Sequence, residues 1–382
     1  MSIPTLPRPP FALDPLVDAP LVGPSTFAIV PSDGSNDGCS AWRIWQPMAF
    51  LRLHGYDCGW EFRHQLDFRA KVLAGVHDLH LLCRVGAMGW ERRLMKTWLA
   101  HMHDAGKTVV YETDDDLFTP FSSDQLHRRA PDAPPWAQLE AERAACVWVL
   151  QRVDGVTVTT QHLATTVRRF TDAPVEVVPN AIDAGWFAQV QAGVQRTVPP
   201  PTIGWAGGAR PDADFEAMAQ AWGRVARRYP QVRFVVQGAQ PEPIARHVPA
   251  DRLVSLPWMP VAAYPQGLVN IDIGCCPLED RAFNRCKTPI KAWEYAVSGA
   301  AVVASPTVYQ RCVTHGTSGL LASTADDWYA ALCWLVEDTH VRQGMADRLR
   351  QDVLRTWSLK ANYWRWPMAW NRLWTEAGHG RG

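Results

Sequence analysis

The chain has 382 residues, of which 47% are hydrophobic and 20% charged, a composition typical of a folded protein and a length that predicts two domains. Its 38 basic residues equal its 38 acidic residues, so no global field exists to attract nucleic acid or an anionic membrane. Any anion site is therefore expected to be local. We find no membrane span and no C-x-x-C spacing among the nine cysteines, which favours reduced thiols and a cytoplasmic location.

Short β-branched segments alternate with longer amphipathic ones after a proline-rich tail at 1–25, which lacks the features of a signal peptide. The first series of predicted strands is 26–32, 78–85, 108–115, 155–160 and 175–180. The second series is 202–208, 232–239, 253–259, 271–278, 301–307 and 319–324. This alternation predicts βα units with parallel sheets, so we expect an α/β protein with two Rossmann-like domains.

Proline and tryptophan patterns suggest where these domains end. The predicted parts are an N-terminal domain at 26–190, a linker at 191–201 that closes with three prolines, a C-terminal domain at 202–352, and a tryptophan-rich helix and tail at 353–382. Trp366, Trp370 and Trp374 fall on one helical face. We expect this helix to pack back by its indoles, the alternative being a platform on which carbohydrate stacks.

Two glycine-rich loops follow predicted strands, where open parallel sheets bind their ligands. The first loop, at 33–40, contains Gly34 and Gly38 and runs into a helix. The second contains Gly207 and Gly208, with Arg210 just beyond. Glycines allow close approach to a phosphate or sugar, although plain turns remain an equal alternative for the first loop.

A third candidate is the segment 283–305, which concentrates cations before an apolar strand. Pro289 is typical of a first helical turn, which places Lys287 and Thr288 at the helix N-terminus, where unpaired amides favour an anion such as a diphosphate. Glu294, further along this helix, is able to accept two hydrogen bonds from a ribose diol. The alternative is a surface helix with solvated charges.

Asp114 and Asp116 follow a predicted strand with the spacing D-x-D. Such a pair is suited to a divalent cation that accompanies a nucleotide diphosphate. We favour the alternative, an acidic turn that caps the next segment and orders nearby basic loops. The twelve histidines form no H-E-x-x-H pattern, and no resident metal is expected.

Two segments carry a family resemblance: "VTVTTQHLATTVRRFTDAPVEVVPNAIDAGWF" and "KTPIKAWEYAVSGAAVVASPT". They resemble motifs of retaining glycosyltransferases of the GT-B fold, from the group 1 or family 4-like set, and the resemblance spans about residues 26–375. Ala181, Val297 and Ala301 depart from the family pattern. The resemblance implies two Rossmann-like domains that face a cleft, with a C-terminal helix packing back.

The resemblance also implies roles for single residues. Glu294 is similar to the second glutamate of an E-x7-E motif, which binds the nucleotide ribose. The first glutamate, which contacts the donor sugar, is replaced by Cys286. Arg210 matches an arginine that holds the diphosphate, but the accompanying lysine has no counterpart nearby, so Lys287 and Arg285 are expected to supply its charge.

The sequence and the resemblance together predict a hexosyltransferase-like enzyme that moves a sugar from a UDP- or GDP-sugar without a cofactor, and the resemblance implies retention. The acceptor stays open: a glycan, a lipid-linked glycan, a small molecule, a protein or modified DNA. It is expected near Gly34–Ser40, Arg84 and Asp114–Asp116. The predicted catalytic residues are Arg210, Arg285 and Lys287, and the predicted donor-binding residues are Gly38, Gly207, Gly208, Cys286, Thr288, Pro289 and Glu294.

Two other functions remain open at this point. One is a metal-dependent nucleotide-sugar enzyme centred on Asp114 and Asp116. The other is a non-catalytic binding or scaffold protein on the same fold, which the loss of the motif's first glutamate at Cys286 suggests.

Overall fold

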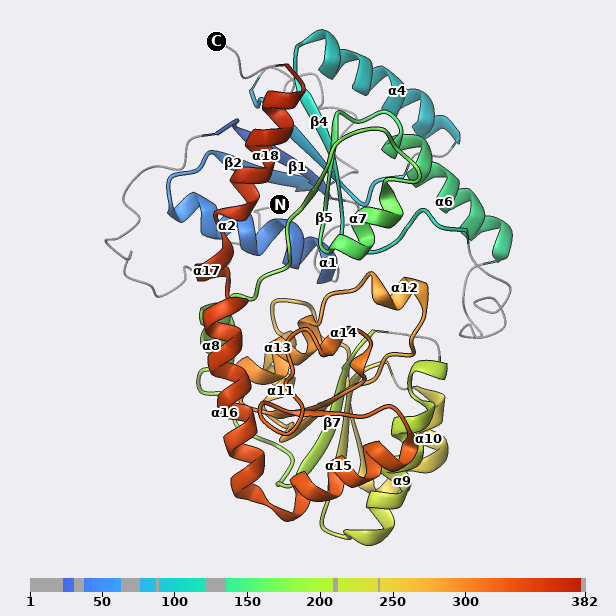
Figure 1. Ribbon diagram of the computed structural model, residues 1–382, viewed down its shortest axis with the longest axis vertical. Coiled ribbons are helices and arrows are strands. Elements are labelled where there is room, and N and C mark those ends of the chain that lie inside the picture. Colours follow the sequence, from blue (N-terminus) through green and yellow to red (C-terminus); the bar gives the residue numbers. More distant parts are fainter. Residues whose placement is uncertain are drawn as a thin grey trace.

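The computed structural model describes residues 23–30, 38–62, 76–86, 89–120, 135–208, 212–239 and 241–378. It contains two six-stranded sheets, one above the other along the long axis of the molecule, each flanked by helices (Figure 1). Neighbouring strands within each sheet run parallel. The predicted α/β class with two Rossmann-like domains is therefore confirmed.

The first sheet has the strand order β2-β1-β3-β4-β5-β6. Its strands are β1 (Thr26–Val30), β2 (Cys58–Phe62), β3 (Leu79–Cys83), β4 (Thr108–Thr113), β5 (Gly155–Val158) and β6 (Val175–Val177). All five predicted strands are present. The sixth, β2, was not predicted because Gly59 and Glu61 interrupt its apolar pattern, and it forms by pairing with β1.

The second sheet has the order β12-β11-β10-β7-β8-β9. Its strands, all predicted, are β7 (Thr202–Gly207), β8 (Arg233–Gly238), β9 (Leu253–Leu256), β10 (Ile273–Cys276), β11 (Ala301–Ala304) and β12 (Leu320–Leu321). The strand order reverses between β7 and β10, as in dinucleotide-binding sheets, and ligands bind beyond the strand ends at such a reversal.

Helices cover both faces of each sheet. Those before residue 170 are α1 (Gly38–Ser40), a π-helical turn (Ala41–Trp45), α2 (Gln46–Leu53), α4 (Gly89–Asp104), α6 (Trp136–Leu150) and α7 (Gln161–Val167). Those after it are α8 (Ala184–Gln191), α9 (Glu216–Arg228), α10 (Glu242–His247), α11 (Tyr264–Leu268), α12 (Ala282–Arg285), α13 (Ile290–Val297), α14 (Pro306–Tyr309), α15 (Ala325–Glu337), α16 (Thr339–Thr356), α17 (Leu359–Asn362) and α18 (Arg365–Glu376).

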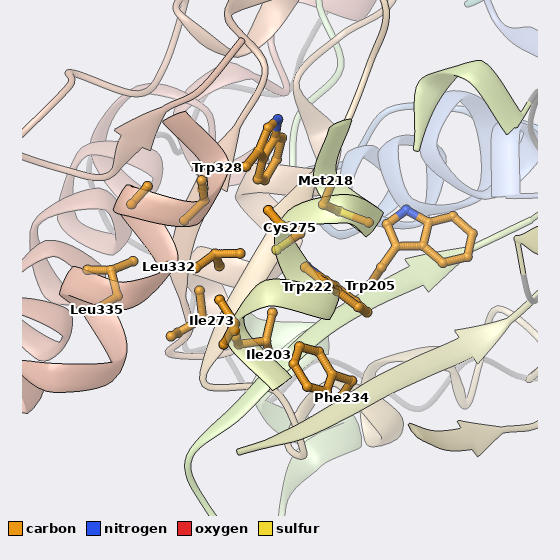
Figure 2. Packing of buried hydrophobic residues seen from close by; sticks show 14 of the residues in the cluster. Ile203, Trp205, Met218, Trp222, Phe234, Ile273, Cys275, Trp328, Leu332 and Leu335 are labelled. Atoms are coloured by element: carbon orange, nitrogen blue, oxygen red, sulfur yellow. The ribbon is translucent and has the colours of Figure 1, made fainter. Parts of the chain in front are cut away.

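One face of the second sheet is closed by α9 and α15. Figure 2 shows Trp222 of α9 and Leu332 of α15 gathered over the strand residues Ile203 and Ile273, all of them buried. Burial of this apolar surface supplies the main driving force for folding of this domain. It also gives the second domain a core of its own.

The opposite face is covered by α13, which lies very close to the sheet. A side chain at Gly274 of β10 would begin 2.3 Å from the Tyr295 ring, so only glycine allows this approach. The Tyr295 hydroxyl also accepts a hydrogen bond of 2.9 Å from the backbone nitrogen of Ala206. These contacts, both made by Tyr295, hold α13 against the sheet beside the carboxyl end of β7, where the sheet order reverses.

The C-terminal helix α18 lies along the first domain (Figure 1). Trp366 and Trp370 are fully buried in a cluster with residues of the first sheet, and Trp374 packs against that cluster. At Gly155 of β5, a Cβ atom would lie 2.8 Å from Leu373 of the helix. The expectation that the helix packs back by its indoles is thus confirmed.

The predicted domain boundaries stay a prediction, but two contacts bear on how the sheets are joined. Trp186 and Phe187 of α8 pack into the cluster of the second sheet, although they precede residue 190. Within the linker, the Arg196 guanidinium pairs with Asp272 at 2.7 Å. This part of the connection is therefore attached to the second domain.

Candidate functional site

A pocket of about 290 Å³ lies where loops from the two sheets meet. The first domain contributes Gly38, Cys39, Trp42, Asp114, Asp115 and Asn180, and the rest of the chain contributes Trp186, Gly207, Gly208, Gln237, Gly238, Trp258, Met259, Val261, Tyr264, Lys287, Thr288, Ile290, Lys291 and Glu294. Many of these residues follow the carboxyl ends of strands, as expected for parallel sheets.

Two carboxylates face the pocket after β4. The Arg84 guanidinium lies 3.6 Å from an oxygen of Asp114 and 3.9 Å from one of Asp115. Burial raises the pKa of the Asp114 carboxyl, and Arg84 opposes that rise. Arg84 itself has a left-handed backbone with φ 52°, an uncommon conformation for a residue with a side chain. Arg84 thus offsets part of the negative charge on this side of the pocket from within the first domain.

Beneath these residues lies a fully buried ion pair that the sequence analysis missed. The Nε atom of Arg43 donates to Glu112 at 2.7 Å, and Nη1 donates to the carbonyl of Val178 at 2.8 Å and to Oδ1 of Asn180 at 2.9 Å. Burial raises the pKa of Glu112, and Arg43 opposes that rise. The available signal was one arginine and one glutamate, each inside an apolar segment, since such charges are rarely buried unless paired.

The second domain contributes the predicted glycine loop. Gly207 ends β7 and Gly208 follows it, and both line the pocket, as does Gly238 at the end of β8. The Trp258 side chain is half exposed and lies over these loops, and a Cβ atom added at Gly208 would lie 3.5 Å from its ring. Backbone at this end of the pocket is therefore open to a ligand beside an aromatic surface.

Glu294 also lies in the pocket and is 3% exposed. Its Oε2 atom accepts a hydrogen bond of 2.8 Å from the Tyr264 hydroxyl and lies 2.7 Å from the Lys291 ammonium. The lysine in turn donates to the Tyr264 hydroxyl at 2.8 Å. This triad fixes the carboxylate one turn into α13, where it can accept hydrogen bonds from a polar ligand.

The loop that precedes α13 touches the first domain with three consecutive residues, Cys286, Lys287 and Thr288. The contacts are Thr160 Oγ1 to the Cys286 carbonyl at 2.9 Å, Lys287 Nζ to Asp115 Oδ1 at 2.6 Å, and Asn180 Nδ2 to Thr288 Oγ1 at 2.9 Å. Lys287 and Thr288 line the pocket. The predicted anion-binding loop is therefore held by both domains.

Cys286 points elsewhere. Its side chain is 1% exposed and belongs to the apolar cluster of the first sheet, with Sγ 4.0 Å from the Thr166 hydroxyl. Burial raises the pKa of this thiol to about 11. The residue predicted to replace a sugar-contacting glutamate thus serves as a contact between the domains, and its side chain does not face the pocket.

Two other predicted residues, Arg285 and Pro289, are not brought to the pocket. Arg285 is exposed and pairs with Asp280 at 2.6 Å, outside the pocket lining. Pro289 precedes α13, which begins at Ile290, and lines a separate groove. Arg210 and Gly34 lie outside the described residues.

The two predicted metal ligands after β4, Asp114 and Asp116, have different surroundings. Oδ1 of Asp116 accepts hydrogen bonds from the backbone nitrogens of Phe118 at 3.1 Å and Thr119 at 3.0 Å, which agrees with the favoured capping role. Asp114 and Asp115 instead lie near Cys39, with possible ligand atoms within 4.8 Å of one another. Their neighbours Arg84 and Lys287 already supply positive charge. Independence from a metal stays a prediction.

Comparison with known proteins shows which proteins this chain is similar to. Residues 200–338 match the family described as "Glycosyl transferases group 1". No curated protein is significantly similar in sequence. In structure, HepE of Anabaena in complex with UDP and glucose has 14% identity and a TM-score of 0.59, covering 90% of this chain and 98% of its own. The sucrose-phosphate synthase of Thermosynechococcus elongatus has 12% identity and a TM-score of 0.62, covering 92% and 99%.

An α-glucosyltransferase in complex with UDP-glucose and DNA containing an abasic site has 12% identity and a TM-score of 0.62, covering 88% of this chain and 97% of its own. These structures share the two-domain architecture, so the fold is GT-B. The group 1 domain at 200–338 makes the chain a glycosyltransferase.

Proposed function

We propose that the chain transfers a sugar from a UDP-sugar to an acceptor bound against the first domain, with retention of configuration at the sugar carbon. The observation that carries this proposal is the pocket itself, where a glycine loop, a lysine, a helix N-terminus and a buried carboxylate meet at the reversal point of the second sheet. UDP is the nucleotide named for two of the similar structures, and GDP is the alternative nucleotide.

The parts of the sugar donor would contact these groups in a fixed order along the pocket. The ribose diol would hydrogen-bond to Glu294, as the family resemblance implies, and the base would lie beside Trp258. The diphosphate would then reach Lys287, Thr288 and the amides at the start of α13. This order leaves the sugar on the side of the first domain.

Departure of the nucleoside diphosphate places negative charge on the β-phosphate. The Lys287 ammonium and the first amides of α13 stabilise that charge more in the transition state than in the bound donor, which lowers the barrier. Lys287 also pairs with Asp115 at 2.6 Å. The diphosphate therefore competes with a carboxylate of the other domain for the same cation.

In this proposal the acceptor attacks the sugar carbon from the same face that the phosphate leaves. The configuration at that carbon is therefore retained. The departing phosphate then receives the acceptor proton, so no protein carboxylate need act as a base. Among the described residues, no helix has the length and apolar character to cross a membrane. Cytoplasmic location and the identity of the acceptor stay predictions.

The proposal is tested by thermal unfolding with UDP, GDP, ADP, CDP and dTDP, each with and without EDTA. At about 100 times its Kd, a nucleotide that binds only the native state adds about 2.7 kcal/mol of stability. We expect UDP to stabilise the wild type equally with and without EDTA. Glu294→Gln should abolish that gain, while Glu242→Ala, which removes an exposed carboxylate on α10, should preserve it.

Each other outcome points to a different function. Stabilisation by GDP alone changes the nucleotide and keeps sugar transfer. Stabilisation that EDTA removes favours a metal-dependent nucleotide-sugar enzyme. If no nucleotide stabilises the protein, the proposal is wrong and a scaffold role is the better interpretation.

A further inference from the structure

A series of hydrogen bonds connects the core of the first domain to the pocket. It runs from Glu112 through Arg43 and Asn180 to Thr288, with distances of 2.7, 2.9 and 2.9 Å. Arg43 and Glu112 are fully buried and Asn180 is 3% exposed. The series therefore crosses from one domain to the other largely out of contact with water, and it ends at a residue that lines the pocket.

The direction of each hydrogen bond is determined by the chemistry of its members. A guanidinium has no acceptor, so the side-chain carbonyl of Asn180 must face Arg43. The amide nitrogen of Asn180 then faces Thr288 and donates to its hydroxyl oxygen. Because that oxygen accepts from Asn180, the hydroxyl hydrogen of Thr288 is directed toward another acceptor.

The start of the series is rigidly held. Oε2 of Glu112 accepts from the Thr157 hydroxyl at 2.5 Å, and Nη1 of Arg43 also donates to the Val178 carbonyl at 2.8 Å. The guanidinium lies 5.4 Å from the centre of the Trp366 ring of α18, within range of a cation–π interaction. The arginine therefore has one orientation, and it imposes that orientation on the Asn180 amide.

We propose that Asn180, oriented by Arg43, is a positioning residue that makes Thr288 a hydrogen-bond donor to the diphosphate of the sugar donor. This inference rests on the proposed function, which supplies the diphosphate. A phosphate oxygen only accepts hydrogen bonds, so it binds a hydroxyl that presents its hydrogen. Lys287, the neighbour of Thr288, contributes charge to the same group, while the hydroxyl contributes direction.

The test compares Asn180→Asp with Asn180→Ala by calorimetric measurement of the Kd of UDP on the full chain. A carboxylate has the size of the amide and still accepts from Arg43, but it turns the Thr288 hydroxyl toward itself. We expect Asn180→Asp to weaken UDP binding about tenfold or more and Asn180→Ala about threefold. If Asn180 served folding alone, aspartate would be the milder change, and that order would overturn the proposal.

A second comparison separates hydrogen-bond direction from charge repulsion. Thr288→Val removes the hydroxyl at nearly constant shape, and in that background Asn180→Asp should change the Kd less than about twofold. A full tenfold loss in that background would mean simple repulsion and would contradict the proposal. Thr288→Ser retains the hydroxyl and should bind UDP as the wild type does. Uridine, which has no phosphate, should bind all these variants equally.

These measurements distinguish the inference from the function on which it rests. A wild-type protein that binds no nucleoside diphosphate contradicts the proposed function. A wild type that binds UDP, with Asn180→Asp unchanged in Kd, contradicts only the role of Asn180. Thermal unfolding of every variant without ligand shows whether a change in Kd arises from loss of the fold.

Discussion

The two domains contribute to one pocket in different ways. In the second domain, the pocket residues lie at strand ends or in and just before α13: Gly207 ends β7, Lys287 precedes α13 and Glu294 stands on it. In the first domain, Asn180 is oriented by a buried ion pair whose members, Arg43 and Glu112, lie 69 residues apart. One half of the site is thus local in sequence and the other half depends on long-range pairing.

This difference explains which part of the sequence matches a known family model. A site built from a strand end and the following helix leaves a short pattern, and the family match covers residues 200–338. A site that depends on buried pairs leaves only single polar residues within apolar segments. The segment 156–187 of the first domain carries a family resemblance, but the buried pair that orients Asn180 has to be found in the structure.

The largest effect that tests this contrast is expected from the C-terminal helix. Trp370→Ala removes a fully buried indole from the core of the first domain and should lower the free energy of unfolding by about 3–5 kcal/mol. Because the second domain has its own core, its stabilisation by UDP should persist. Calorimetry measures the loss of stability and the stabilisation by UDP. The control is Trp334→Ala, at a 44% exposed position on α15, which should have a mild effect. One cooperative transition in which both domains unfold together would contradict this separation.

The next effect concerns the cation that joins the domains. Lys287→Ala should raise the activation free energy for turnover of a UDP-sugar by about 2.7–4 kcal/mol, which lowers the rate roughly 100- to 1,000-fold. Its ion pair with Asp115 is partly exposed, so stability should fall by about 1 kcal/mol or less. Rates of donor hydrolysis or transfer measure this. The matched change Arg285→Ala, at the exposed end of α12 just before this loop, should leave turnover nearly unchanged, and equal losses would refute the assignment.

A smaller effect is expected from restoring the family's glutamate. Cys286→Glu places a carboxyl in an apolar cluster and should lower stability by about 1–3 kcal/mol, without a gain in donor hydrolysis. Burial raises the pKa of such a carboxyl, so the loss should be small near pH 4, grow as the pH rises from the ordinary glutamate pKa to the raised one, and level off above it. Urea unfolding between pH 4 and 8 measures this, with Cys286→Ala as the control. Faster hydrolysis would show that this side chain reaches the sugar.

Local patterns determined much of the architecture in advance. Eleven of the strands were predictable because each is a short apolar run between turn residues, and the tryptophan spacing identified the face of α18 that packs back. Lys287, Glu294 and the glycines of the second domain were predictable because strand ends and helix starts place ligands in parallel sheets. These features are determined by residues close to one another in the sequence.

Tertiary structure decided the rest. The sequence shows a cysteine at 286 but not that its side chain turns into the other domain, because that direction depends on which surface packs against the loop. The same holds for Arg285, which the fold leaves exposed, and for Asn180, whose hydrogen bonds come from residues far away in the chain. Periodicity specifies which face of a segment is buried, whereas the partner of a buried polar group is chosen only when distant segments pack together.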